Sequence, residues 1–99
     1  METDTIYKDG SIINFDKPTR LLNAGFSNNS DRERAVTLVA HDEDGQSRII
    51  KSTSIPVGGV DHWVFIRPFK FLAGEMLVVY CEGSTNVDVT LKFEEGSNG

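Results

Sequence analysis

The 99-residue sequence predicts an all-β protein: a single-domain antiparallel β-sandwich of seven to eight strands, with a jelly-roll or Ig-like arrangement. Two observations lead to this prediction. Hydrophobic and polar residues alternate along several segments, which is the period of a half-buried strand and not of a helix. Turn-forming residues separate these segments at intervals of about 8–12 positions. A chain of this length has room for one core, so residues 1–99 are expected to form one domain with loose residues at both termini.

Three strands are predicted in the first half of the chain. The first is the β-branched segment 11–15. The second and third are alternating segments, each with three apolar side chains on one face: Leu22, Ala24 and Phe26, then Val36, Leu38 and Ala40. A short helical turn within residues 31–40 is the alternative, because Ser30 and Glu33 have the spacing of a helix capping box.

Four more strands are predicted in the second half. Residues 47–54 and 60–66 are rich in β-branched and aromatic side chains. Pro68 is expected to end the second of these strands, because proline has no N–H to donate to a sheet. Residues 76–81 are almost wholly apolar, as in a strand covered on both faces. Residues 86–94 alternate most strictly, with four apolar residues on one face: Val87, Val89, Leu91 and Phe93.

The charge balance is acidic, with ten Lys and Arg residues against fifteen Asp and Glu residues and a net charge of −5. Such a field repels nucleic-acid phosphates and anionic lipid headgroups. No run approaches the roughly 18 apolar residues of a membrane span, and the N-terminal residues lack the pattern of a secretory signal. We therefore expect no nucleic-acid or membrane partner, and synthesis in a cytosol.

The residue types that commonly carry catalysis do not form a recognisable set. Cys81 is the only thiol, lies in an apolar segment and is expected to be a buried packing residue; nothing favours a pair with His62. Spacings typical of zinc and phosphate sites are missing, so no catalytic, cofactor-binding or metal-binding residue is predicted. Asp42, Glu43 and Asp44 are expected at the tip of a hairpin, and whether they bind an ion stays open.

Aromatic residues gather in and after the segment 60–66. Trp63 and Phe65 share one face of the predicted strand, while valine, isoleucine and histidine occupy the other, so both faces are largely apolar. One interpretation is a central strand with a covering loop. The other is an aromatic surface that meets another subunit, with Arg67 beside it to pair with acidic groups. On the second interpretation, the candidate interface consists of Trp63, Phe65, Arg67, Phe69 and Phe71.

Several short motifs occur in a characteristic order along residues 20–95. They are Asn-x-Gly-x-Ser-Asn at 23–28, an acidic hairpin at 42–45, Ser-Ile-Pro at 54–56, Phe-Leu-Ala-Gly-Glu at 71–75 and Asn-Val-Asp-Val-Thr-Leu at 86–91. In this order they resemble small β-sandwich virion proteins encoded by tailed bacteriophages. The chain departs from that pattern at residues 57–58, where Val-Gly stands for the usual Ala-Gly, and at Glu75, which stands for the usual Asp.

The resemblance implies a non-enzymatic structural subunit of a bacteriophage virion. Its role would be that of a decoration or cement protein, a head–tail connector or a tail accessory protein. Such a subunit associates with itself and with other virion proteins, needs no cofactor, and is made in the host cytoplasm before it enters the virion. The alternative is a cellular, non-enzymatic binding module for a carbohydrate or protein ligand, with Trp63 and Tyr80 as candidate contacts for a sugar.

Overall fold

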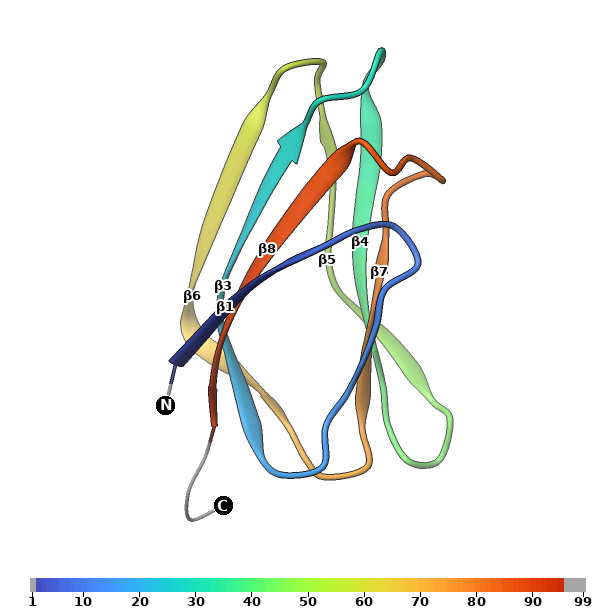
Figure 1. Ribbon diagram of the computed structural model, residues 1–99. Coiled ribbons are helices and arrows are strands. Elements are labelled where there is room, and N and C mark those ends of the chain that lie inside the picture. Colours follow the sequence, from blue (N-terminus) through green and yellow to red (C-terminus); the bar gives the residue numbers. More distant parts are fainter. Residues whose placement is uncertain (1, 96–99) are drawn as a thin grey trace.

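The computed structural model describes residues 2–95, with side chains from residue 5 onward, and these residues form eight strands and no helix (Figure 1). The predicted β-sandwich is therefore confirmed. The strands are β1 (Glu2–Tyr7), β2 (Ile12–Asn14), β3 (Thr19–Asn28), β4 (Arg34–His41), β5 (Ser47–Ile55), β6 (Val60–Phe71), β7 (Met76–Tyr80) and β8 (Val87–Glu95).

The strands form two antiparallel sheets of four, in the orders β1-β8-β3-β6 and β2-β7-β4-β5. The sheets face each other in two layers (Figure 1). Strand β1 pairs with β8, β2 with β7, β3 with β6 and β4 with β5, as in one long antiparallel ribbon rolled into a sandwich. Only the β4–β5 hairpin stays within one sheet. This strand order is that of a jelly roll, which selects one of the two predicted arrangements.

The core lies between the inner faces of the two sheets. The alternation predicted for β8 is confirmed, because all four of its apolar side chains are buried, and so is that of Val36, Leu38 and Ala40 in β4. Aromatic rings fill one end of the interior: Phe15 stacks on Phe71 with ring centroids 4.3 Å apart and meets the edge of Phe93 at 5.6 Å. The core is thus continuous from one sheet to the other.

A β-bulge in β3 changes which leucine faces the core. The ladder register of β3 shifts between Leu21 and Asn23, so Leu21 is fully buried and Leu22 is only partly so. The expectation that Leu22 shares the inner face with Ala24 and Phe26 is therefore wrong. An extra residue in one strand reverses the side-chain alternation beyond it.

The same bulge lengthens β6 beyond its predicted end. Val64 pairs with Asn23 and Phe69 pairs with Leu21, so residues 65–68 stand opposite a single residue of β3. Pro68 lies in this unpaired stretch, where its missing N–H breaks no ladder hydrogen bond. The strand therefore continues through Pro68 to Phe71 instead of ending there.

The N-terminal end differs from the expectation of loose residues at both termini. Residues 2–7 form β1 and pair with β8 from Glu2↔Glu94 to Tyr7↔Val89. Glu95 is the last residue of β8, and residues 96–99 lie outside the described part of the chain. The helical alternative for residues 31–40 is also wrong, since β4 occupies most of that segment.

Candidate interaction surface on strands β5 and β6

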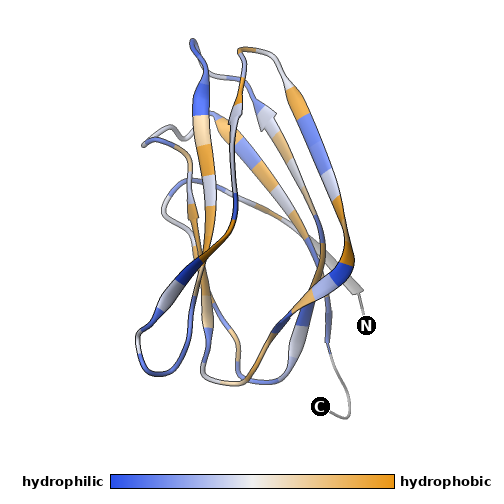
Figure 2. Ribbon diagram, turned by 180° about the vertical axis from the view of Figure 1, so that it is seen from behind, coloured by the Kyte–Doolittle hydropathy of each residue, from blue (hydrophilic) through white to orange (hydrophobic). Residues whose placement is uncertain are grey.

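Strands β5 and β6 are the last strands of their respective sheets and lie on the same side of the sandwich. We call this side the β5–β6 edge, and the opposite side, made by β1 and β2, the β1–β2 edge. The chain passes directly from β5 to β6 through residues 56–59, crossing from one sheet to the other. Figure 2 views the molecule from behind relative to Figure 1 and shows both hydrophobic and hydrophilic segments along the long β6 ribbon.

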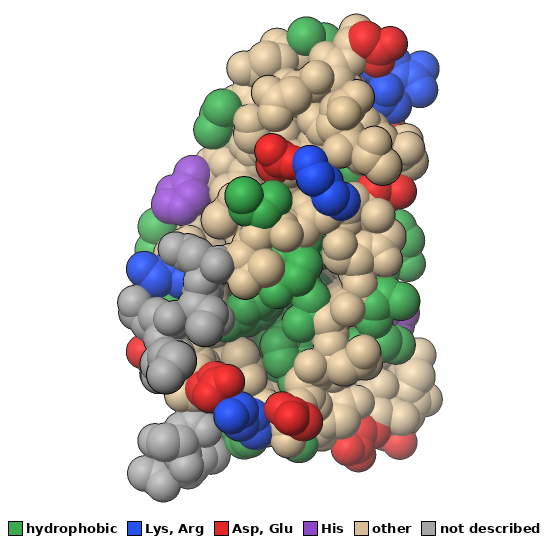
Figure 3. Space-filling view, in the orientation of Figure 1, with side chains coloured by type: hydrophobic (Ala, Val, Ile, Leu, Met, Phe, Trp, Pro, Cys, Tyr) green, Lys and Arg blue, Asp and Glu red, His purple; other side chains and the backbone are tan. Residues whose placement is uncertain are grey.

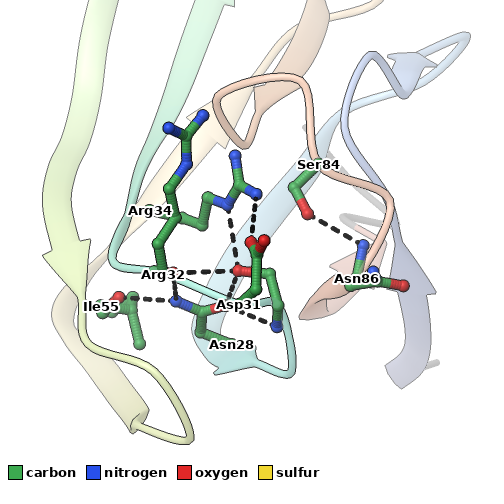
Figure 4. A network of polar contacts seen from close by, with 8 residues as sticks. Asn28, Asp31, Arg32, Arg34, Ile55, Ser84 and Asn86 are labelled. Carbon is green, nitrogen blue, oxygen red and sulfur yellow. Dashed lines mark hydrogen bonds and ion pairs between the residues drawn. The ribbon is translucent and has the colours of Figure 1, made fainter.

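The crossing from β5 to β6 is held by the buried side chain of Asn28 at the end of β3 (Figure 4). Its Nδ2 donates to the carbonyls of Ile55, at 2.8 Å, and Arg32, at 2.9 Å. Its Oδ1 accepts from the N–H of Ser30 at 2.9 Å and from its hydroxyl at 2.6 Å. The backbone of Asn28 also bonds to the two glycines of the crossing, Gly58 and Gly59. The position of both edge strands at this end is therefore set by one fully satisfied amide.

The aromatic residues of the candidate interface lie on the inner side of β6. Trp63, Phe65 and Phe69 are partly buried and pack against the core, and Trp63 meets the ring of Phe26 edge-on at 5.0 Å. Phe71 is only 1% exposed and forms part of the core. Of the five predicted interface residues, Phe71 is therefore unavailable to a partner, and Arg67 is the one in the exposed class.

Two cations from β5 cover these aromatic rings. The Nζ of Lys51 lies 3.5 Å from the centroid of the Trp63 ring, and the guanidinium carbon of Arg48 lies 4.6 Å from that of Phe69. These contacts join the two sheets where the sandwich would otherwise be open. A cation over an aromatic face is attracted by the ring quadrupole, so Lys51 and Arg48 both close this side and shield the rings from solvent.

The exposed aliphatic side chains of β6 are Val60 and Val64 on its outer face and Ile66 in the unpaired stretch. Val60 is 76% exposed, Val64 69% and Ile66 98%. Ile66 belongs to the unpaired stretch 65–68, which presents it to solvent. The sequence already shows that this strand is apolar on both faces, and the structure shows which face is covered. The aromatic face packs on the core and the aliphatic face is exposed.

The β5–β6 edge is also the basic part of an acidic protein. Residues 47–71 contain Arg48, Lys51, Arg67 and Lys70 but only one acid, Asp61. The four ion pairs between described side chains all lie elsewhere in the molecule. Within residues 5–95, no carboxylate is within ion-pair distance of Arg67 or Lys70. Asp61 instead accepts a hydrogen bond from the N–H of His62 at 2.9 Å.

The remaining sequence candidates have structural roles. Cys81 is fully buried, and burial raises the pKa of its thiol to about 11, with a further contribution from the charge of Asp9. Its N–H donates to the Asp9 carboxylate at 2.6 Å. His62 lies on the outer face of the other sheet, over Gly25, so the fold does not place it beside the thiol. A thiol held in its protonated form is a poor nucleophile.

The acidic residues 42–44 form the predicted hairpin tip between β4 and β5. The Asp42 carboxylate accepts from the N–H groups of Asp44, at 2.9 Å, and Gln46, at 3.0 Å, and Gly45 has a φ of 83°. The carboxylate thus stabilises its own turn. No group of His, Cys, Asp and Glu side chains within the described residues is arranged to hold a metal ion.

Trp63 and Tyr80, the candidate sugar contacts, lie on separate surfaces. Tyr80 is 47% exposed on β7, in the second sheet, while Trp63 faces inward at the edge of the first sheet under Lys51. Strand β7 is also less covered than its sequence suggests. Val78 lies outside the core cluster although it is buried, with Ile12 and Val39 as its ladder partners, and Tyr80 on the same face is exposed.

Neither a scan against protein-family models nor a search of curated proteins finds a match for this chain. Over residues 2–95 the structure contains no helix long and apolar enough to cross a membrane. The site is therefore defined by its own geometry: a basic edge with exposed aliphatic side chains on a rigid sandwich.

Proposed function

We propose that this chain is a non-enzymatic structural subunit of a bacteriophage virion, a decoration or cement protein or a head–tail or tail accessory protein. It acts by associating with itself and with other virion proteins. The observation that carries the proposal is the β5–β6 edge, where aliphatic side chains such as Ile66 and cations such as Arg67 are both exposed.

The physical argument is that such an edge is costly for a protein that functions alone. Edge strands present unpaired N–H and C=O groups, and proteins normally shorten, cover or charge them. Exposed apolar groups clustered on a rigid element mark contact sites for other macromolecules. Strand β6 has twelve residues and ends its sheet with Val60, Val64 and Ile66 exposed, so its outer side is suited to a protein neighbour.

The architecture supports this proposal without deciding it. Jelly rolls recur in viral capsid proteins, but also in lectins and cupins. A fold hosts many functions, so the surface and not the topology has to carry the argument. Carbohydrate binding is the weaker candidate, because Trp63 and Tyr80 do not converge on one surface.

A density gradient of phage lysate from the source culture tests the proposal. We expect the chain to band with intact particles, at a fixed ratio to the major shell protein measured by mass spectrometry. Hundreds of copies per particle would indicate a decoration protein and about a dozen a connector. A chain that stays at the top of the gradient while particles band normally would exclude the virion role, and a cellular binding module would replace it.

A further inference from the structure

We infer that copies of this chain join head to tail, with the β5–β6 edge of one copy bound to the β1–β2 edge of the next. The inference rests on the proposed function, since it specifies how the self-association occurs. Three features carry it: strand direction, a projecting side chain with a matching hollow, and opposite charge.

Strand direction permits a lateral repeat of the sandwich. Both sheets are antiparallel throughout, so strand direction alternates across β1-β8-β3-β6 and across β2-β7-β4-β5. With four strands in each sheet, β1 of a neighbouring copy in the same orientation runs antiparallel to β6, and β2 of that copy runs antiparallel to β5. The neighbour thus continues both sheets in the antiparallel pattern, which is strand addition at an exposed edge.

The β1–β2 edge contains an apolar hollow. Figure 3 views the molecule from this side and shows hydrophobic side chains at the bottom of a depression. The hollow has a volume of about 180 Å³ and apolar walls that include Tyr7, Ile13, Phe15 and Phe93. Its rim carries Asp16 and other polar residues. At about 30 Å³ per water molecule, this volume corresponds to about six waters, enough for the four-carbon side chain of an isoleucine.

Ile66 is the side chain that matches this hollow. It projects from the unpaired stretch of β6 that stands opposite Leu22. The adjacent residue of β3, Leu21, is the ladder partner of Phe93 in the wall of the hollow. Ile66 and the hollow therefore lie at the same level along the strand direction, on opposite edges of one sheet. A sideways shift of the molecule by its own width brings Ile66 of one copy to the hollow of the next.

The distribution of charge favours the head-to-tail contact over a two-fold contact between two identical edges. Residues 47–71 have four cations and one acid, whereas residues 5–18, whose side chains the structure describes, have two acids, Asp9 and Asp16, and two lysines. Both of those lysines, Lys8 and Lys17, are already paired with Asp88 and Glu95. A two-fold contact between two β5–β6 edges would instead bring together two surfaces that each carry four cations and one acid. Like charges across an interface oppose the wrong partner, so the basic edge selects the acidic one.

A head-to-tail contact leaves one free edge at each end. It therefore produces a ring where the rotation between copies closes and a filament where it does not. This property allows a test that distinguishes it from a two-fold dimer, by blocking each edge in a separate variant.

The test uses the purified full chain and measures mass by sedimentation velocity over a concentration series. A β6-blocked variant carries Ile66→Asp and Arg67→Glu, and a β2-blocked variant carries Asn14→Arg and Asp16→Arg; all four residues are exposed. We expect the wild type to form multimers that weaken with salt, each blocked variant to be monomeric, and their equimolar mixture to form dimers and nothing larger. The control is Tyr80→Asp with Arg32→Glu, which changes exposed residues outside strands β1, β2, β5 and β6 and should keep wild-type assembly.

Three results would overturn the inference: a monomeric wild type, a mixture that stays monomeric, or a β2-blocked variant that dimerises by itself through β6. Circular dichroism and thermal melting verify that each variant is folded. If the β6-blocked variant is unfolded, Ile66→Ser takes its place, and unchanged assembly would then contradict the role of Ile66. A wild type that is monomeric in solution yet bands with particles would remove this inference and leave the proposed function intact. A wild type that forms multimers but does not band with particles would support the head-to-tail contact and contradict the virion role.

Discussion

The Asn28 corner and the β5–β6 edge meet their chemical requirements in opposite ways. At the corner, a fully buried amide finds all its hydrogen-bond partners within the chain, from Ser30, Arg32 and Ile55. At the edge, Ile66 and the cations of β6 remain exposed although the same strand supplies Phe71 to the core. The stability of the single chain and the association between copies therefore depend on different residues. A substitution at one set should change one property and leave the other unchanged.

The largest expected effect is on the inner side of β6. Phe71→Ala removes a fully buried ring that stacks on Phe15, and we expect a loss of about 3–5 kcal/mol in the free energy of unfolding. Ile66→Ala, five positions away on the exposed side, should change it by less than about 0.5 kcal/mol. Urea denaturation of both variants measures the contrast. Similar losses at the two positions would mean that Ile66 contributes to the fold of the single chain.

Asn28→Ala is expected to be next in size. It removes four side-chain hydrogen bonds and leaves the buried carbonyl of Ile55 without that donor, so we expect a loss of about 3 kcal/mol. Asn28→Asp should also destabilise, because a carboxylate cannot donate to the carbonyls of Arg32 and Ile55. The neighbouring Asn29→Ala is the matched control and should have almost no effect, since Asn29 is exposed. Equal losses at positions 28 and 29 would contradict the role of the amide.

The fold was largely predictable because its signal is local. Strict alternation identified the inner faces of β4 and β8 from their own residues. The exchange of Leu22 for Leu21 was not predictable, because a bulge is a property of the pairing between strands and leaves no mark on one strand alone. Strand β1 was missed for a similar reason: its sequence is polar, and its partner, β8, is distant in sequence.

The candidate site was predictable only in part. The sequence showed that segment 60–66 is apolar on two faces, but which face is covered depends on where the second sheet lies. The strand was expected to end at Pro68, and residues 65–68 instead form an unpaired stretch within a longer strand, with Ile66 exposed. The basic character of residues 47–71 was present in the sequence and hidden by the overall net charge of −5. A count of charge by segment would have found it.

Cys81 offers a test of the buried side of the comparison. Burial raises the pKa of its thiol from 9.0 to about 11, so the folded chain holds this proton more tightly than the unfolded chain does. The associated stability is complete below pH 9 and is lost as the pH rises through 11, by roughly 3 kcal/mol in all at about 1.4 kcal/mol per pKa unit. Denaturant midpoints from pH 8 to pH 10.5, compared with those of Cys81→Ala, measure the difference.

Thiol labelling gives the matching contrast with the edge. Native Cys81 should react slowly with a thiol reagent and quickly after denaturation, because the side chain is fully buried. Ser52→Cys, placed at an exposed position of β5, should add one rapidly labelled thiol without changing the slow phase of Cys81. Rapid labelling of native Cys81 would show that the core opens at this end of β7.

The smallest expected effect concerns the contact that closes the β5–β6 edge. Lys51→Gln removes the charge over the Trp63 ring and keeps most of the aliphatic stem, so we expect a loss of about 0.5–1 kcal/mol and a shift in the emission of the single tryptophan. Lys70→Gln removes an equal charge from the same edge without a ring beneath it and should leave both the stability and the emission unchanged. The two variants have the same net charge, so a difference between them reports the ring contact and not the field of the protein. If both variants lose stability equally, Lys51 acts through that general field, and the closure of this edge depends on the packing of Trp63 against Phe26 instead.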